Sequence, residues 1–177
     1  MKLTIPYGKD EAQDLVIPDE NFAGVIYPND VTVGNESDEI RRALDNPAGG
    51  PTLEEFLKGG KDVVFIVNDG TRPTPTRKVL DALDERMDLS SARYLIATGS
   101  HRAPTDEEYD FIFGKHYQPL KDKIYSHDSK NDNCINLGKS KNGTEMEVNE
   151  MAVNADRLVI ITSVEPHYFA GYTGGRK

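Results

Sequence analysis

The sequence has little of several features that define other classes of protein. Cys134 is its single cysteine in 177 residues, which excludes an internal disulfide bond and a metal cluster built on several thiolates. The sequence has no apolar run near the roughly 20 residues that a membrane-spanning helix needs. The first residues, Met-Lys-Leu-Thr-Ile-Pro, lack the sustained apolar core of a signal peptide. We therefore expect a cytoplasmic protein with a reduced thiol and no membrane partner.

Positive charge is also scarce. The chain has 21 Lys and Arg residues against 30 Asp and Glu residues, a formal net charge of -9 and a pI of about 4.9. Nucleic-acid binding needs a basic surface, so this class of function is excluded. Any anionic ligand must be held by a few local cations, which points to a small molecule. The length fits one domain with a full core, or one domain with extensions.

Three apolar runs are typical of strands that are covered on both faces, and each ends in a polar loop that contains proline. The runs span residues 62–67, 93–97 and 157–163. Helices are predicted after the first two runs, one capped by Thr74 and ending near residue 87, the other over 105–113. This order of strand, loop and helix predicts an α/β fold, Rossmann-like, with a mostly parallel sheet and crossover helices.

The rest of the chain carries weaker signals. The other predicted elements are a hairpin over residues 2–5 and 13–17, helices over 37–45 and from Thr52, strands over 123–127 and 144–148, and a short helix over 149–156. Two histidines, His116 and His127, lie outside the loops that follow the buried strands. We expect both to be solvated surface residues.

The loops that follow the three apolar runs hold the residues with chemical potential. They carry Asp69-Gly-Thr-Arg72, Gly99-Ser-His-Arg102, and His167 with the glycine-rich stretch 171–177. Ligands of parallel sheets bind outside the carboxyl ends of the strands, where these loops meet. The sequence therefore predicts that Asp69, Arg72, His101 and His167 line one crevice. The alternative for residues 163–177 is a flexible tail.

This set of residues suits a few kinds of chemistry. Two histidines from different loops can stand on opposite faces of a substrate, as inversion at carbon by two general bases requires. Either Arg72 or Arg102 can hold a carboxylate through a bidentate contact. Backbone amides at 173–175 and the predicted helix start after Thr74 suit a phosphate. A metal bound by His101 and His167 is a less favoured alternative, because no partner carboxylate is obvious.

Three motifs together resemble the N-terminal domain of the nickel-dependent lactate racemase family. They are Asp69-Gly-Thr-Arg-Pro-Thr-Pro75, Ala97-Thr-Gly-Ser-His-Arg102 and Glu165-Pro-His-Tyr-Phe-Ala-Gly-Tyr-Thr-Gly-Gly-Arg-Lys177. The resemblance implies an isomerase that racemises or epimerises a 2-hydroxy acid. In that family, a nickel pincer nucleotide derived from a pyridinium mononucleotide accepts a hydride from the substrate and returns it.

The resemblance also implies a role for six residues. His101 and His167 resemble the paired acid/bases, Arg72 a substrate-binding residue, Asp69 and Phe169 residues near the cofactor, and Lys177 the lysine that attaches the cofactor through a thioamide. The family's nickel-ligating histidine lies beyond the position of Lys177, so no metal ligand is assigned here.

The resemblance further implies that residues 1–177 are the truncated N-terminal catalytic and cofactor-binding domain of a two-domain enzyme. Its expected partners are the substrate and the C-terminal domain of the same parent chain, and we expect the domain alone to be inactive. The alternative is a non-enzymatic binding module for a phosphorylated or carboxylated metabolite. Such a module needs the glycines and arginines but not two opposed histidines.

Overall fold

The computed structural model describes residues 1–27, 29–167, 169 and 171–175, and the chain divides into two compact units, Met1–Val33 and Gly34–Lys177. The first unit contains the predicted hairpin, formed by antiparallel strands β1 (Lys2–Tyr7) and β2 (Glu11–Val16). In the described part of the chain, no helix is both long enough and apolar enough to cross a membrane.

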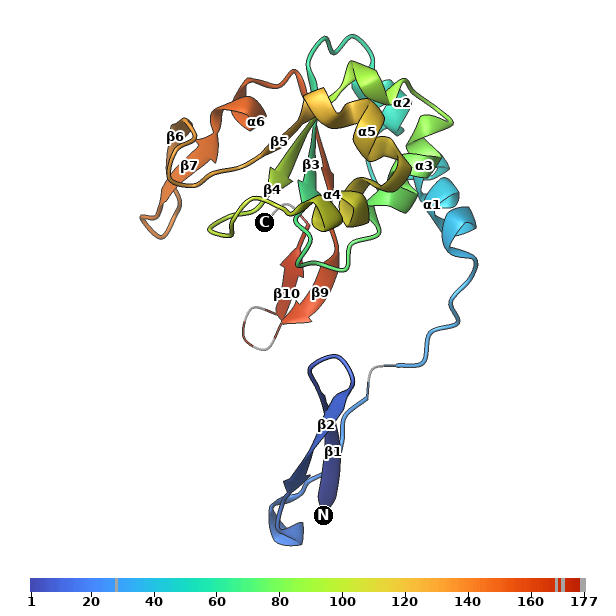
Figure 1. Cartoon of the computed structure of the whole chain (residues 1–177), viewed down its shortest axis with the longest axis vertical. Coiled ribbons are helices and arrows are strands. Elements are labelled where there is room, and N and C mark those ends of the chain that lie inside the picture. The colour runs from blue at the N-terminus through green and yellow to red at the C-terminus, as the bar shows by residue number, and fades with distance from the viewer. Residues whose placement is uncertain (28, 168, 170, 176–177) are drawn as a thin grey trace. The chain divides into compact units, whose positions relative to one another are not determined.

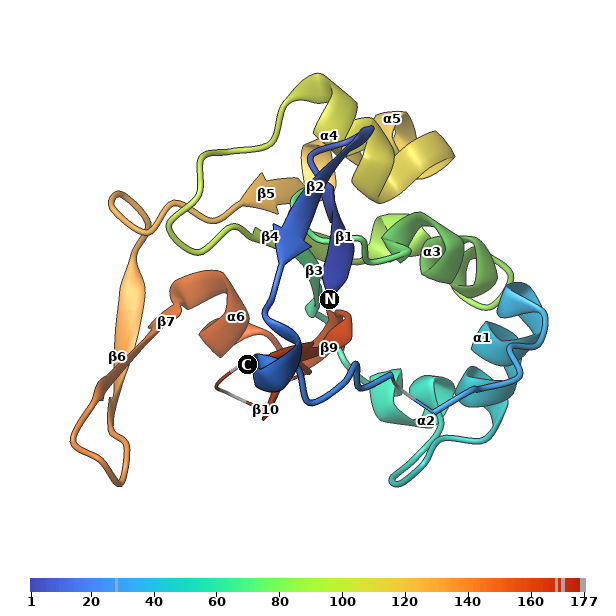
Figure 2. The same cartoon turned by 90° about the horizontal axis from the view of Figure 1, so that it is seen from below.

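The second unit holds the predicted α/β arrangement (Figure 1). Its elements are α1 (Glu36–Asp45), α2 (Leu53–Leu57), β3 (Val63–Asn68), α3 (Thr76–Asp84), β4 (Arg93–Ala97), α4 (Asp106–Phe113), α5 (Tyr117–Leu120), β5 (Ile124–Ser126), β6 (Cys134–Lys139), β7 (Glu145–Asn149), α6 (Glu150–Asn154), β8 (Arg157–Ile161), β9 (Val164–His167) and β10 (Gly171–Gly174). Helices α1 to α5 lie on one side of the central sheet and α6 on the other (Figures 1 and 2).

The central sheet has four parallel strands in the order β5-β4-β3-β8, which confirms the predicted parallel sheet. Numbered by their order along the chain, these strands lie as 3-2-1-4. This is the order of the first four strands in a doubly wound nucleotide-binding fold, whose ligand site lies where the order reverses. Here the reversal falls between β3 and β8. The Rossmann-like label still fits loosely, because among the described residues the short α6 is the one helix that packs on the second face.

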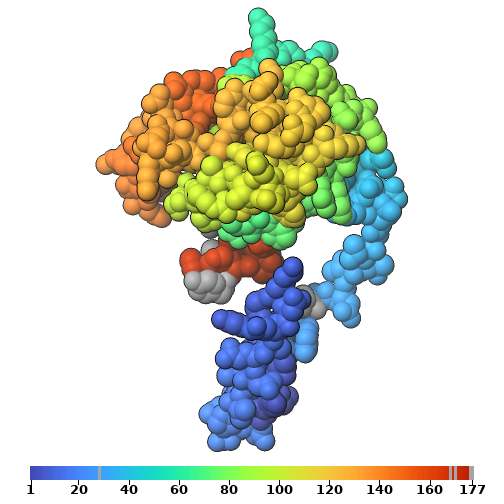
Figure 3. Space-filling model, in the orientation of Figure 1, coloured from blue at the N-terminus to red at the C-terminus, as the bar shows by residue number. Residues whose placement is uncertain are grey.

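The larger core lies between the sheet and helices α1 to α5. Val63, Phe65 and Val67 alternate onto this face of β3, where they meet the buried Leu80 and Leu83 of α3. The space-filling view shows α4 and α5 covering the sheet on the side that faces the viewer (Figure 3). Burial of this continuous apolar face is the main reason that the predicted strands form a sheet here.

An aromatic cluster forms the centre of this core. The Tyr94 ring stacks on Phe65 with centroids 5.5 Å apart and meets the edge of Phe113 at 5.9 Å. The buried Tyr94 hydroxyl donates a hydrogen bond to the carbonyl oxygen of Leu89 at 2.9 Å. Burial raises the pKa of this phenol well above its ordinary value, so it stays a neutral donor.

Two local predictions are wrong in detail. Thr74 does not cap α3: its Oγ1 accepts a hydrogen bond from Asn68 Nδ2 at 2.6 Å, and Pro75 occupies the N-cap position. No strand was predicted between β5 and β7, but β6 forms there and pairs with β7. Apart from the half-buried Ile135 its side chains are exposed, and its register shifts between Asn136 and Lys139, so its Asn and Gly residues hid the strand in the sequence.

The expectation for His116 and His127 is also wrong. His116 is buried beside α3, where its Nε2 contacts Asp81 Oδ1 at 2.8 Å. The His127 side chain is 18% exposed, and its Nδ1 lies 3.1 Å from Asp132 Oδ2. Each polar ring has a carboxylate partner that offsets the loss of water. Asp81 lies 35 residues from His116 in the sequence, so that pairing leaves no trace in the local pattern.

The aromatic cluster predicts the effect of a one-atom change. Tyr94→Phe keeps the ring packing and removes the hydroxyl, which leaves the Leu89 carbonyl without this donor. We expect the free energy of unfolding to fall by about 1 kcal/mol, measured by chemical denaturation. The control is Tyr125→Phe on β5, where the side chain is exposed and the change should stay within about 0.5 kcal/mol. Equal effects of the two substitutions would contradict the role of this hydrogen bond.

Candidate functional site

Strands β3, β4 and β8 run parallel and end at the same edge of the sheet (Figure 1). The chain leaves β3 through the loop of residues 69–75 and leaves β4 through residues 98–105. Beyond β8 it forms a hairpin of β9 and β10. The three segments that the sequence singled out therefore follow three neighbouring strands of one sheet.

The first pair of candidate residues at this edge is Asp69 with His101. Asp69 is 7% exposed and lies directly after β3, while His101 lies in the loop after β4. The His101 Nδ1 is 2.6 Å from Asp69 Oδ2. Because a carboxylate can only accept, Nδ1 must be the donor, which leaves Nε2 as the unprotonated nitrogen of the neutral ring. Thr71 Oγ1 donates to the other oxygen of Asp69 at 2.7 Å and so fixes the carboxylate.

A second pair, Arg102 with Glu108, holds the loop after β4 against α4. The guanidinium donates to both oxygens of Glu108, at 2.7 and 3.0 Å, and the backbone N–H of Thr105 donates to the same carboxylate at 2.8 Å. The Arg102 contact first, and then the Thr105 N–H, lower the pKa of Glu108. The Glu108 side chain also packs on Gly70: a Cβ at Gly70 would lie 2.7 Å from its Cγ.

The stretch after β8 is a hairpin in its described residues, so the flexible-tail alternative is wrong for them. Antiparallel pairing places Pro166 opposite Tyr172 and Glu165 opposite Thr173. Side chains alternate, so Glu165 and His167 share one face of β9. Gly174 has φ of 87°, and a Cβ there would lie 1.7 Å from the backbone oxygen of Ser163, which only glycine avoids.

His167 and Phe169 lie close together at the end of β9. Their ring centroids are 4.4 Å apart and the rings are nearly perpendicular. The backbone N–H of Phe169 donates to His167 Nδ1 at 3.4 Å, so in this contact Nδ1 carries no proton. The neutral His167 ring then carries its hydrogen on Nε2, the opposite arrangement to His101.

Arg72 connects the loop after β3 with strand β9. Its guanidinium lies 3.8 Å from Glu165 Oε2, and the two side chains are 53% and 34% exposed. Glu165 stands on β9, two residues before His167, so this contact joins the loop after β3 to the hairpin after β8. The strand order reverses between these two neighbouring strands.

The structure brings some of the predicted residues together. A pocket of about 240 Å³ at this edge is lined by Asp69, Gly70, Thr71, His101, Arg102 and Glu108. In the described part of the chain, Arg72 and His167 are not among its lining residues, and Arg72 instead meets Glu165. That all four predicted residues share one crevice remains a prediction. Lys177 lies outside the described residues.

Sequence reasoning missed three residues that shape this edge. Thr71 and Glu165 orient Asp69 and Arg72, and Glu108 holds Arg102. Glu165 was signalled by its place two residues before His167 on a strand. Glu108 was covered only by the helix predicted over 105–113. Across the described residues, no cluster of three or more His, Cys, Asp or Glu side chains is arranged to hold a metal ion.

The contact of Gly70 with Glu108 predicts the effect of adding one methyl group. Gly70→Ala forces the Glu108 side chain away and loosens its pairing with Arg102, so we expect about 1–3 kcal/mol lower stability in chemical denaturation. Gly49→Ala is the matched control, because no atom lies within 4 Å of the added Cβ. Stability that is equal in the two variants would show that the loop adapts without cost.

Comparison with known proteins identifies the family of this chain. A family model described as the lactate racemase N-terminal domain matches residues 7–177. A lactate racemase of Thermoanaerobacterium thermosaccharolyticum is 38% identical over 184 residues, which cover 99% of this chain and 42% of the relative. One of Lactiplantibacillus plantarum is 33% identical over 182 residues, which cover 99% and 43%.

A solved structure gives the same result. The lactate racemase apoprotein from T. thermosaccharolyticum matches with a TM-score of 0.81 and 38% identity, over 99% of this chain and 42% of that chain. The chain thus spans about two fifths of the length of these relatives. The family model covers nearly the whole chain, and the chain belongs to the family of lactate racemase N-terminal domains.

Proposed function

We propose that this chain is the N-terminal part of a two-domain enzyme that racemises or epimerises a 2-hydroxy acid, with His101 and His167 as its acid/base pair. The observation that carries the proposal is the hydrogen bond of His101 to the buried Asp69, which presents a basic Nε2 at the edge of the sheet. The names of the relatives make lactate the first substrate to test.

We assign the two histidines opposite roles in a reversible proton transfer. Nε2 of His101 takes the hydroxyl proton in one direction, while His167 returns a proton to the oxygen from the other face. To act as the acid, His167 must carry a second proton on Nδ1, which breaks its contact with the Phe169 N–H. That contact is long, at 3.4 Å, so it opens at little cost. In the reverse direction the two residues exchange roles.

Arg72 is the better candidate for holding the substrate carboxylate. Arg102 already makes two short hydrogen bonds to Glu108, whereas Arg72 has one ion-pair contact at 3.8 Å and is about half exposed. A substrate carboxylate would compete with Glu165 for the Arg72 guanidinium through a bidentate contact. We therefore assign substrate binding to Arg72 and loop stabilisation to Arg102.

The described residues fit part of a nickel pincer nucleotide. The Phe169 ring is 75% exposed at the tip of the hairpin, where it offers a surface for an aromatic ring, and Lys177 would attach the group. Asp69 would lie near the group while it orients His101. No cluster of three or more His, Cys, Asp or Glu side chains among the described residues would hold nickel by itself, and the family resemblance puts the nickel-ligating histidine beyond the position of Lys177. When bound, the group supplies an acceptor that takes a hydride from the α carbon and returns it.

A binding module for a phosphorylated or carboxylated metabolite is the alternative. It would use Arg72 and the backbone of the glycine-rich hairpin but would have no use for a proton-accepting His101. The Asp69–His101 hydrogen bond favours the enzyme, because a buried carboxylate that fixes the tautomer of a histidine is what a general base requires.

Exchanging the Asp69 carboxylate for an amide tests its role. In Asp69→Asn the side-chain NH₂ can donate to His101 Nδ1, so we expect the proton of the neutral ring to move to Nε2, observed by ¹⁵N NMR of this chain. In the full-length enzyme the racemisation rate should fall about 10²–10⁴-fold. Asp81→Asn makes the same change beside His116, away from this edge, and should leave the rate nearly unchanged.

A second test uses the histidine pair in the full-length enzyme. His101→Ala and His167→Ala should each lower the lactate racemisation rate in both directions by at least about 10²-fold, because each turnover uses both groups. The double variant should lose much less than the product of the single effects. His116→Gln, at the histidine that contacts Asp81 of α3 away from this edge, is the control.

Other outcomes of this test would support the alternative. If both single variants raised KM and left kcat unchanged, the histidines would be binding groups.

Residues 1–177 alone, supplied with cofactor, should show no interconversion of D- and L-lactate above the His101→Ala control. Lys177→Ala should lose the bound cofactor, and retention of both cofactor and activity would contradict the proposed attachment.

A further inference from the structure

Strand β8 forms one edge of the central sheet, and within the described residues it pairs with β3 alone. The N–H of Arg157 donates to Asp62 O, on the β3 side of the strand. The backbone N–H and C=O groups of successive residues point to opposite sides of a strand. Those of Leu158 and Ile160 therefore point away from β3. These groups form an open hydrogen-bonding edge.

The two edges of the sheet differ in how they are protected. At the opposite edge β5 has three residues, and very short edge strands resist pairing with other chains. By contrast β8 has five residues, and four of them, Leu158 to Ile161, form an apolar run. Ile160 is 38% exposed and lies on the same face of the sheet as α6, in the part that α6 does not cover. Such a strand is typical of the interior of a parallel sheet rather than of its edge.

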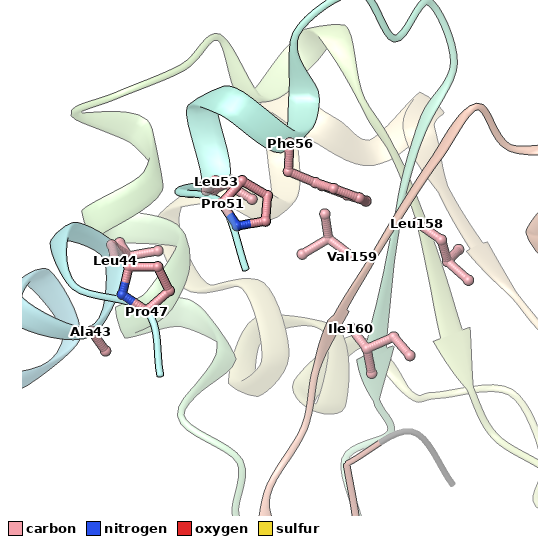
Figure 4. Close-up of a pocket in the computed structure, with 9 residues that line it drawn as sticks. All are labelled: Ala43, Leu44, Pro47, Pro51, Leu53, Phe56, Leu158, Val159 and Ile160. Carbon is pink, nitrogen blue, oxygen red and sulfur yellow. The ribbon is translucent and has the colours of Figure 1, made fainter. Parts of the chain in front are cut away.

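A groove of about 370 Å³ lies beside the same edge (Figure 4). Its lining consists of aliphatic, aromatic and proline side chains from α1, the following turn, α2 and β8, namely Ala43, Leu44, Pro47, Pro51, Leu53, Phe56, Leu158, Val159 and Ile160. In Figure 4, Val159 points toward Phe56, whereas Leu158 and Ile160 point to the other side of the strand. Both sides of β8 thus present apolar surface beside its open edge.

We propose that this edge and groove receive an apolar strand of the full-length parent chain, paired parallel to β8, with its crossover segment packed on Leu158 and Ile160. The inference rests on the proposed function, in which this chain is part of a longer enzyme. Two observations carry it. The sheet order 3-2-1-4 is continued beyond its fourth strand in doubly wound folds. The matched relatives are also more than twice as long as the matched region.

The test compares hydrogen exchange in residues 1–177 and in the full-length protein. The amides of Leu158 and Ile160 should exchange at least about 100-fold more slowly in the full-length protein. The amide of Ser126, which points outward from β5, is the internal control and should change little. Equal exchange of the β8 amides in both proteins would overturn the proposal.

Two substitutions provide an independent measurement. Ile160→Lys should lower the Tm of the full-length protein by about 5 °C or more, since it places a charge in the covered edge, and that of residues 1–177 by less than about 2 °C. Tyr125→Lys, at a similarly exposed residue of the β5 edge, should have a small effect in both. A small effect of Ile160→Lys in the full-length protein would contradict the proposal.

The outcomes separate this inference from the proposed function. A full-length protein that racemises lactate but leaves β8 exchanging fast overturns the edge proposal alone. One that protects β8 but shows no racemisation overturns the function alone. If protection of Leu158 and Ile160 in residues 1–177 rises with protein concentration, a second copy occupies the edge instead, and the assignment to the parent chain is wrong.

Discussion

Parallel pairing of β3 with β4 on one side and with β8 on the other is the constraint on which the candidate site depends. It brings the ends of three strands to one edge, although their loops are far apart in the sequence. Two contacts between different segments at that edge result from this arrangement. His101 reaches Asp69 from the neighbouring strand, and Arg72 reaches Glu165 across the reversal of strand order. In both of these contacts the two partners are far apart in the sequence.

The sequence predicted the parts of the fold that depend on local pattern. The apolar runs of β3, β4 and β8 are long enough to identify buried strands, and the capping boxes at Thr52 and Thr105 mark real helix starts. Strand order was not predictable, because it depends on which apolar edges meet. The pairing of β6 with β7 was missed because its residues are mostly polar and exposed.

The candidate site was predictable in its members but not in their pairing. Sequence position and family resemblance selected Asp69 and His101, yet only the structure shows that they share a 2.6 Å hydrogen bond. The residue pattern alone left Arg72 and Arg102 as equal candidates for a carboxylate, and the family resemblance assigned this role to Arg72. Their partners distinguish them, since Arg102 is held by Glu108 through two hydrogen bonds. Such distinctions depend on tertiary contacts, which a residue pattern does not encode.

The reversal of strand order has a consequence for the assembly of the site during folding. Residues 69–92 separate β3 from β4, whereas residues 69–156 separate β3 from β8. Closing the longer loop costs on the order of 1 kcal/mol more conformational entropy. The junction that places Arg72 near Glu165 is therefore the part of the sheet with the greatest entropic cost of closure. A ligand that bridges the two loops would bind only the closed form, and its binding energy would hold that junction together.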